Sequence, residues 1–134
     1  MRRGFQLPEE DAQFVDGLGL PWETVKEGDT RWLVVHNWPV PPGYNHSTAM
    51  AGLILPASYP DGQIDMVYFH PLLALTCGKG INNLTPRAFD GKEWQQWSRH
   101  RTESNPWRPG VDNIATHFLL VDYWLRRENA GVAA

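Results

Sequence analysis

Eleven prolines are spread along a chain of 134 residues, and they limit the possible folds more than any other feature. Because proline lacks a backbone N–H and interrupts helices, this distribution favours short strands and defined loops over long helices. The clearest helical period lies in residues 111–127. Its apolar residues fall on one face of a helix: Val111, Ile114, Phe118, Val121 and Leu125. The sequence therefore predicts a helix over this stretch.

Four runs of apolar and β-branched residues, bounded by glycine, proline or aspartate, predict strands. One run, residues 31–38, is apolar or aromatic at nearly every position, which predicts a strand covered on both faces. The sequence Glu-Gly-Asp-Thr at residues 27–30 is a hairpin signal that joins this run to the preceding one. The four predicted strands cover residues 22–26, 31–38, 48–55 and 64–69.

A short first helix is predicted over residues 8–16. Pro8 suits the first helical position, where its missing N–H costs nothing. The carboxylates of Glu9, Glu10 and Asp11 suit the positive end of the helix dipole.

Residues 72–110 are rich in glycine and proline and predict a long loop, with a short helix over residues 93–98. Long loops inside compact domains are usually functional. The order of elements predicts one α+β domain over residues 1–134. We expect a four-stranded antiparallel meander with an N-terminal and a C-terminal helix packed on it.

The composition argues against several classes of protein. Twelve Lys and Arg against 15 Asp and Glu give a formal charge of −3, which gives no reason to expect nucleic-acid binding. The single cysteine excludes an internal disulfide and favours a reducing, cytoplasmic location. No run of 18 apolar residues predicts a membrane span, and no glycine-rich phosphate motif or multi-cysteine pattern predicts a cofactor.

Ser98 lies in the part of the predicted loop that is richest in reactive side chains, Trp97-Ser98-Arg99-His100-Arg101. Serine is a weak nucleophile that needs a base within hydrogen-bond reach, and His100 is the candidate base. Arg99 and Arg101 are candidates for stabilising an anion. The simpler interpretation is a basic loop packed by its tryptophans.

Cys77 is the alternative nucleophile, because a lone cysteine with histidines elsewhere is a candidate for catalysis. The apolar residues 72–75 before it favour a packed and inert position instead, since free cysteine is among the most buried residue types. Reactivity would require an exposed and electropositive setting.

The histidines give no metal-binding pattern. His100 and His117 could pair, but no carboxylate stands at ligand spacing, so we interpret His117 as a half-buried structural residue. His36 and His46 have no partner pattern. We therefore expect no metal.

Three short motifs occur in an order that resembles the ubiquitin-conjugating enzyme superfamily. Residues 53–60, Leu-Ile-Leu-Pro-Ala-Ser-Tyr-Pro, look like the strand and the Pro-x-x-Tyr-Pro turn of that superfamily. His70-Pro71 stands where the superfamily has a strand ending in His-Pro-Asn. Trp107-Arg108-Pro109 matches the Trp-x-Pro before the helix behind the active site. The resemblance implies a UBC-like fold over most of residues 8–127.

The closer resemblance is to a divergent prokaryotic branch of this superfamily, through residues 91–100 and 107–112. Genes of that branch stand beside genes for an activating enzyme, a ubiquitin-like protein and a JAMM-type metallopeptidase. The resemblance implies that the first two are partners, with the metallopeptidase in the same pathway. The branch typically lacks the usual cysteine and keeps a histidine, which His100 would match.

The chain departs from the superfamily at two places. Leu72 stands where the superfamily has the asparagine that stabilises the oxyanion, and its alternatives here are Asn82, Asn83 and Asn105. Counting back from Trp107 places the nucleophile near Ser98, nine residues earlier. Cys77 is 30 residues earlier and qualifies only if the loop doubles back.

The resemblance thus implies a bacterial, cytoplasmic carrier that accepts the C-terminus of a ubiquitin-like modifier from an activating enzyme. The acyl group would form an oxyester on Ser98, with His100 as general base and with Arg99 and Arg101 near the oxyanion. The alternatives are a catalytically inactive adaptor of the same fold and a carrier that uses Cys77.

Two further expectations concern the surface and the packing. The first turn of the first helix, Glu9, Glu10 and Asp11, is expected to contact the activating enzyme, although capping alone would also explain these charges. Trp107 and Pro109 are expected to anchor the long loop against the final helix.

Overall fold

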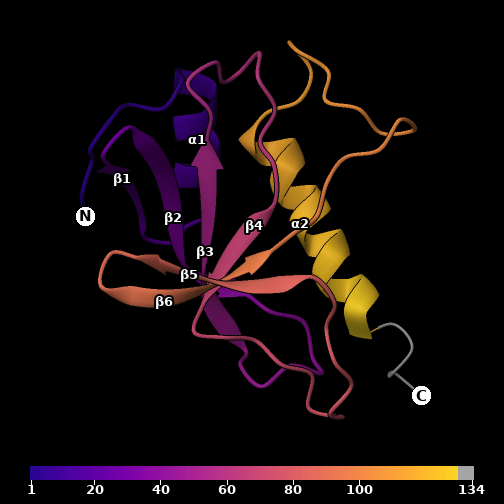
Figure 1. Cartoon of the computed structure of the whole chain (residues 1–134). Coiled ribbons are helices and arrows are strands. Elements are labelled where there is room, and N and C mark those ends of the chain that lie inside the picture. The colour runs from indigo at the N-terminus through magenta and orange to yellow at the C-terminus, as the bar shows by residue number, and fades with distance from the viewer. Residues whose placement is uncertain (130–134) are drawn as a thin grey trace.

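The computed structural model describes residues 1–129 of the chain. These residues form, in order, α1 (Glu9–Gly17), β1 (Trp22–Glu27), β2 (Thr30–Pro39), β3 (Thr48–Leu55), β4 (Val67–His70), β5 (Leu84–Phe89), β6 (Lys92–Trp97) and α2 (Ile114–Asn129) (Figure 1). All six strands belong to one antiparallel sheet with the order β1-β2-β3-β4-β6-β5. The α+β class is confirmed, whereas the expectation of four strands is wrong.

The two additional strands, β5 and β6, occupy the segment predicted as a loop with a short helix over residues 93–98. They form a hairpin whose turn is Asp90-Gly91, and both residues have positive φ, 54° and 71°. Aspartate followed by glycine is a favoured pair for such a two-residue turn. Pro86 is tolerated in β5 because this strand lies at the edge of the sheet. The predicted helix is therefore a strand, and the missed signal is the Asp-Gly pair.

Both helices contribute to the main core, which lies against one face of the sheet. Val15 of α1 packs into it, together with the predicted stripe of α2 from Ile114 to Leu125. Val111 is the exception, because it precedes the helix and is exposed. None of the described helices is both long and apolar enough to cross a membrane.

A second, smaller cluster on the other face confirms that β2 is covered on both sides. Trp32 of β2 contacts Tyr68, Phe89 and Trp94, with the Phe89 ring stacked at 4.0 Å between centroids. Gly52 of β3 faces this cluster, and a Cβ atom there would lie 3.2 Å from ring carbons of both Trp32 and Trp94. The hairpin missed in the sequence thus supplies half of this aromatic cluster.

Trp107 anchors the segment after β6, although not to the final helix as expected. Its indole N–H donates to the carbonyl of Pro60 at 3.1 Å, and its ring packs on Tyr59. Pro109 is exposed. The anchor is therefore the turn that follows β3, because the indole finds its hydrogen-bond acceptor there.

Candidate functional site

Ser98 follows β6 directly, where the chain leaves the sheet. Its backbone N–H donates to the backbone carbonyl of Asn83 at 3.0 Å. Its half-buried hydroxyl accepts a long hydrogen bond of 3.5 Å from Gln96 Nε2. Within residues 1–129, no hydrogen bond joins this hydroxyl to His100. The predicted nucleophile and base are neighbours in sequence, but the structure does not pair them.

The imidazole of His100 is held by a carboxylate that the sequence analysis did not name. Its Nδ1 lies 2.9 Å from Oδ2 of Asp65, which precedes β4, and 64% of the His100 side chain is exposed. A carboxylate on one ring nitrogen orients a histidine and leaves the other nitrogen to act as a base. Asp65 is 35 residues away along the chain, so no local pattern could have identified it.

The two arginines beside His100 have structural partners. Arg99 forms an ion pair with Glu128 at 3.0 Å, donates to the carbonyl of Asn82 and lies over the Trp97 ring. The side chain of Arg101 is almost inaccessible, and its guanidinium lies 3.5 Å from Asp112. Both side chains therefore fasten the segment after β6 to the rest of the domain.

Cys77 is exposed with a free thiol, contrary to the packed position that the neighbouring leucines favoured. The apolar run before it alternates, because Leu73 and Leu75 are buried whereas Leu72 is exposed. The backbone N–H of Lys79 points at the sulfur, with 3.4 Å between nitrogen and Sγ. The thiol thus lies at the surface beside a backbone hydrogen-bond donor.

The loop that carries Cys77 is tied to the sheet on its N-terminal side. The Asn45 side chain donates to the carbonyl of Leu72 at 3.1 Å and accepts from the N–H of Ala74 at 2.9 Å. The buried amide of Gln95 bonds both the N–H and the carbonyl of Leu73. These contacts fix the chain up to a few residues before the cysteine.

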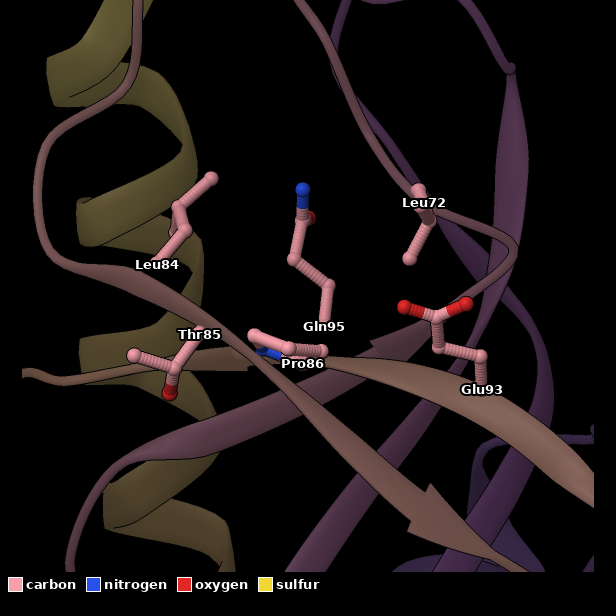
Figure 2. A pocket seen from close by; sticks show the side chains of 6 residues that line it. All are labelled: Leu72, Leu84, Thr85, Pro86, Glu93 and Gln95. Atoms are coloured by element: carbon pink, nitrogen blue, oxygen red, sulfur yellow. The ribbon is translucent and has the colours of Figure 1, made fainter.

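A cavity of about 230 Å³ lies at the base of this loop and is shown in Figure 2. Leu72 and Leu84, which flank the loop, form part of its wall, and the carboxylate of Glu93 lies close to Leu72 in this view. Leu72 therefore adds an apolar wall at the position where the resemblance leads one to expect an asparagine.

The segment between Cys77 and Ser98 doubles back. Leu84 pairs with Trp97 at the open end of the β5–β6 hairpin, and Ser98 donates to Asn83 across it. The two ends of the hairpin therefore lie side by side, so that Ser98 is next to the end of the loop that carries Cys77. Within residues 1–129, however, no hydrogen bond joins Cys77 to Ser98 or to His100.

The first turn of α1 divides into exposed and buried carboxylates. Glu9 and Glu10 are exposed. Asp11 is buried and accepts a hydrogen bond of 2.8 Å from the Tyr59 hydroxyl. Burial raises the pKa of Asp11, and the hydrogen bond from Tyr59 opposes this shift. Asp11 is thus a structural residue, and only Glu9 and Glu10 are available to a partner.

His117 is fully buried rather than half-buried, and its Nε2 lies 2.8 Å from the carbonyl of Met66. Burial lowers its pKa to about 4, despite the opposing hydrogen bond to Met66. In the part of the chain that the structure describes, no three His, Cys, Asp or Glu residues gather in a way that could hold a metal ion.

The sequence was also compared with known proteins. The model of a family described as prokaryotic E2 family E matches residues 7–128, a range that holds α1, all six strands and nearly all of α2. No curated protein and no solved structure matches the chain. The match confirms the resemblance to a prokaryotic branch of the ubiquitin-conjugating superfamily. The chain therefore belongs to prokaryotic E2 family E.

Proposed function

We propose that this protein carries a ubiquitin-like modifier, whose C-terminus it accepts from an activating enzyme by acyl transfer. Family membership supports a role in a ubiquitin-like conjugation pathway. The observation that carries the proposal is the exposed thiol of Cys77, in a loop that begins directly after His70-Pro71. A carrier needs a nucleophile that a second protein can reach, and this thiol satisfies that requirement.

Cys77 and Ser98 are the two candidate carriers, and the contacts favour Cys77. The Ser98 hydroxyl is half-buried, and within residues 1–129 no hydrogen bond joins it to His100, whose imidazole is its proposed base. Serine needs such a base, whereas a thiol is the better nucleophile once its thiolate forms. The pairing of Leu84 with Trp97 at the two ends of the β5–β6 hairpin supports this choice, because part of the sequence between Cys77 and Trp107 leaves and returns within the hairpin.

The transfer is an exchange of one acyl bond for another. The Cys77 sulfur attacks the carbonyl carbon of the activated modifier, and a new carbon–sulfur bond forms. The bond between that carbon and the activating enzyme breaks, and the leaving group takes up the thiol proton. A nucleophile of the target, such as an amine, then attacks the same carbon and releases the Cys77 thiol.

His100 is the candidate general base, because Asp65 orients its ring and the side chain is exposed. If Ser98 is the carrier, His100 would accept the proton of the Ser98 hydroxyl, whereas no contact of the described residues places His100 beside Cys77. A positioned base contributes about 10²–10⁴-fold to a rate, so His100→Ala should slow transfer by a factor in this range.

An inactive adaptor that binds the activating enzyme or the modifier is the second candidate function. The specific observation in its favour is Leu72, which gives the cavity an apolar wall where an oxyanion donor is expected. An adaptor would form no covalent adduct.

The experiment combines the protein with its activating enzyme, the modifier and ATP, and measures the adduct by gel electrophoresis with and without thiol reductant. We expect an adduct that reductant removes, that is lost in Cys77→Ala and that persists in the matched variant Ser98→Ala. In Cys77→Ser the adduct should resist reductant and yield to hydroxylamine. A reductant-resistant wild-type adduct that vanishes in Ser98→Ala would transfer the role to Ser98. Absence of any adduct would support the adaptor.

A further inference from the structure

A cleft of about 430 Å³ runs between the segment after β6 and the outer side of α2. His100 and Arg101 line it from the segment, and Tyr123, Trp124 and Arg127 line it from the helix. Neither Cys77 nor Ser98 is among its lining residues, whereas His100, the candidate general base, is one of them.

The cleft has a surplus of positive charge in a chain whose formal charge is −3. Arg101 and Arg127 both line it, and no aspartate or glutamate does so among the described residues. Arg127 is exposed and forms no ion pair within residues 1–129. The lining is therefore complementary to an anion.

Arg101 adds a second observation that points to a ligand. Only 6% of its side chain is exposed, yet its Nε has no hydrogen-bond acceptor among the described residues. Its only anionic neighbour in that part of the chain is Asp112, 3.5 Å from the guanidinium, and Asp112 also faces Arg108 at 3.8 Å. A buried donor without an acceptor is costly. Because Arg101 lines the cleft, a carboxylate bound there would add an acceptor beside its guanidinium.

The helix side of the cleft adds an exposed apolar surface. Tyr123, which lines the cleft, is 56% exposed, and the half-buried side chain of Leu120 lines it from one turn earlier on α2. Trp124 also lines the cleft, and its ring lies against buried His117, at 5.6 Å between centroids. An apolar wall rimmed by charge is typical of a site of protein interaction.

We propose that this cleft binds a peptide segment of a partner protein in which a carboxylate stands next to an apolar side chain. The carboxylate lies on Arg101 and Arg127, because guanidinium groups bind carboxylates through paired hydrogen bonds. The apolar side chain packs on Tyr123 and Leu120. The proposal does not depend on which side chain carries the modifier, or on whether one does.

A titration of the full-length protein with a blocked acidic peptide tests the proposal. The probe is acetyl-Leu-Glu-Asp-Leu-amide, and the control probe replaces its two acidic residues with Gln and Asn. We follow the backbone amide resonances of ¹⁵N-labelled protein. The acidic peptide should shift the backbone amide resonances of Arg101, Tyr123 and Arg127. It should also bind about tenfold more tightly than the control peptide with Gln and Asn. Its affinity should fall as salt is added.

Arg127→Glu and Arg126→Glu form a matched pair of variants. Both residues are exposed neighbours on α2 and both changes alter the net charge equally, but Arg126 faces a different cleft, beside Trp38 and Asp122. Arg127→Glu should weaken binding of the acidic peptide about tenfold, while Arg126→Glu should leave it nearly unchanged. Equal weakening by both variants, equal binding of both peptides or an absence of shifts at these residues would overturn the proposal.

Discussion

The hydroxyl of Tyr59 donates a hydrogen bond to Asp11 at 2.8 Å and accepts one from the backbone N–H of Ile114 at 2.9 Å. One side chain thereby connects α1, the turn after β3 and the first residue of α2. Burial raises the pKa of Tyr59, and the bond to Asp11 acts in the same direction. The tyrosine of the Pro-x-x-Tyr-Pro turn is therefore a structural tie between the two helices.

We predict that Tyr59→Phe lowers the free energy of unfolding by about 1–3 kcal/mol, because it leaves Asp11 and the Ile114 N–H without their partner. Denaturant titration measures the change. Tyr123→Phe is the control, since the Tyr123 hydroxyl is in an exposed side chain, and it should unfold like the wild type. Equal stability of the two variants would show that the Tyr59 bonds contribute nothing.

Charge reversal at Glu9 and Glu10 should weaken association with the activating enzyme and reduce its dependence on salt. Both side chains are exposed at the start of α1, where charge steers the approach of a partner. The control is Glu27→Lys with Asp29→Lys, an equal change of charge on exposed residues around the β1–β2 turn. Surface plasmon resonance at low salt measures the rate at which each double variant associates with the activating enzyme. Similar rates for the two double variants would count against a contact at α1.

Gly52→Ala should destabilise the fold by about 1–3 kcal/mol through overpacking. The new methyl group would lie 3.2 Å from carbons of the fully buried Trp32 and Trp94 rings, which have little room to move. Gly17→Ala in α1 is the matched control, because no atom lies within 4 Å of its added carbon. Thermal melts should show a lower Tm for the first variant only, and an unchanged Tm would remove the claim.

The buried His117 should make stability depend on pH. Its pKa is about 4 in the folded chain, below the ordinary 6.5, so the unfolded chain binds a proton more readily between these values. The free energy of unfolding should therefore fall as pH decreases from about 6.5 to about 4, by at most about 1.4 kcal/mol per pH unit. His117→Gln should reduce this slope, while His46→Gln, at an exposed loop position, should retain it. Denaturant titrations across this pH range compare the slopes, and an identical slope in His117→Gln would refute the assignment.

Local signals were enough for the elements whose own residues dictate their shape. The β1–β2 hairpin, the two-sided burial of β2 and the apolar face of α2 all follow from turn residues and periodicity within one segment. The β5–β6 hairpin was not predicted because β6 mixes polar residues with Trp94 and Trp97. The side chains of these two tryptophans belong to different clusters on the two faces of the sheet. Such a strand has no simple alternation, and its pairing with β4 stabilises it.

The sequence by itself determined the α+β class and the order of the first three strands, and it named the candidate reactive side chains. Only the tertiary structure decided which of those side chains are available. In the folded chain Cys77 is exposed, His100 contacts Asp65, and Asp11 is buried with a hydrogen bond from Tyr59. These outcomes depend on contacts between residues far apart in the chain, such as the 35 positions between Asp65 and His100. No periodic pattern encodes contacts of that kind, because they form only when separate elements pack together.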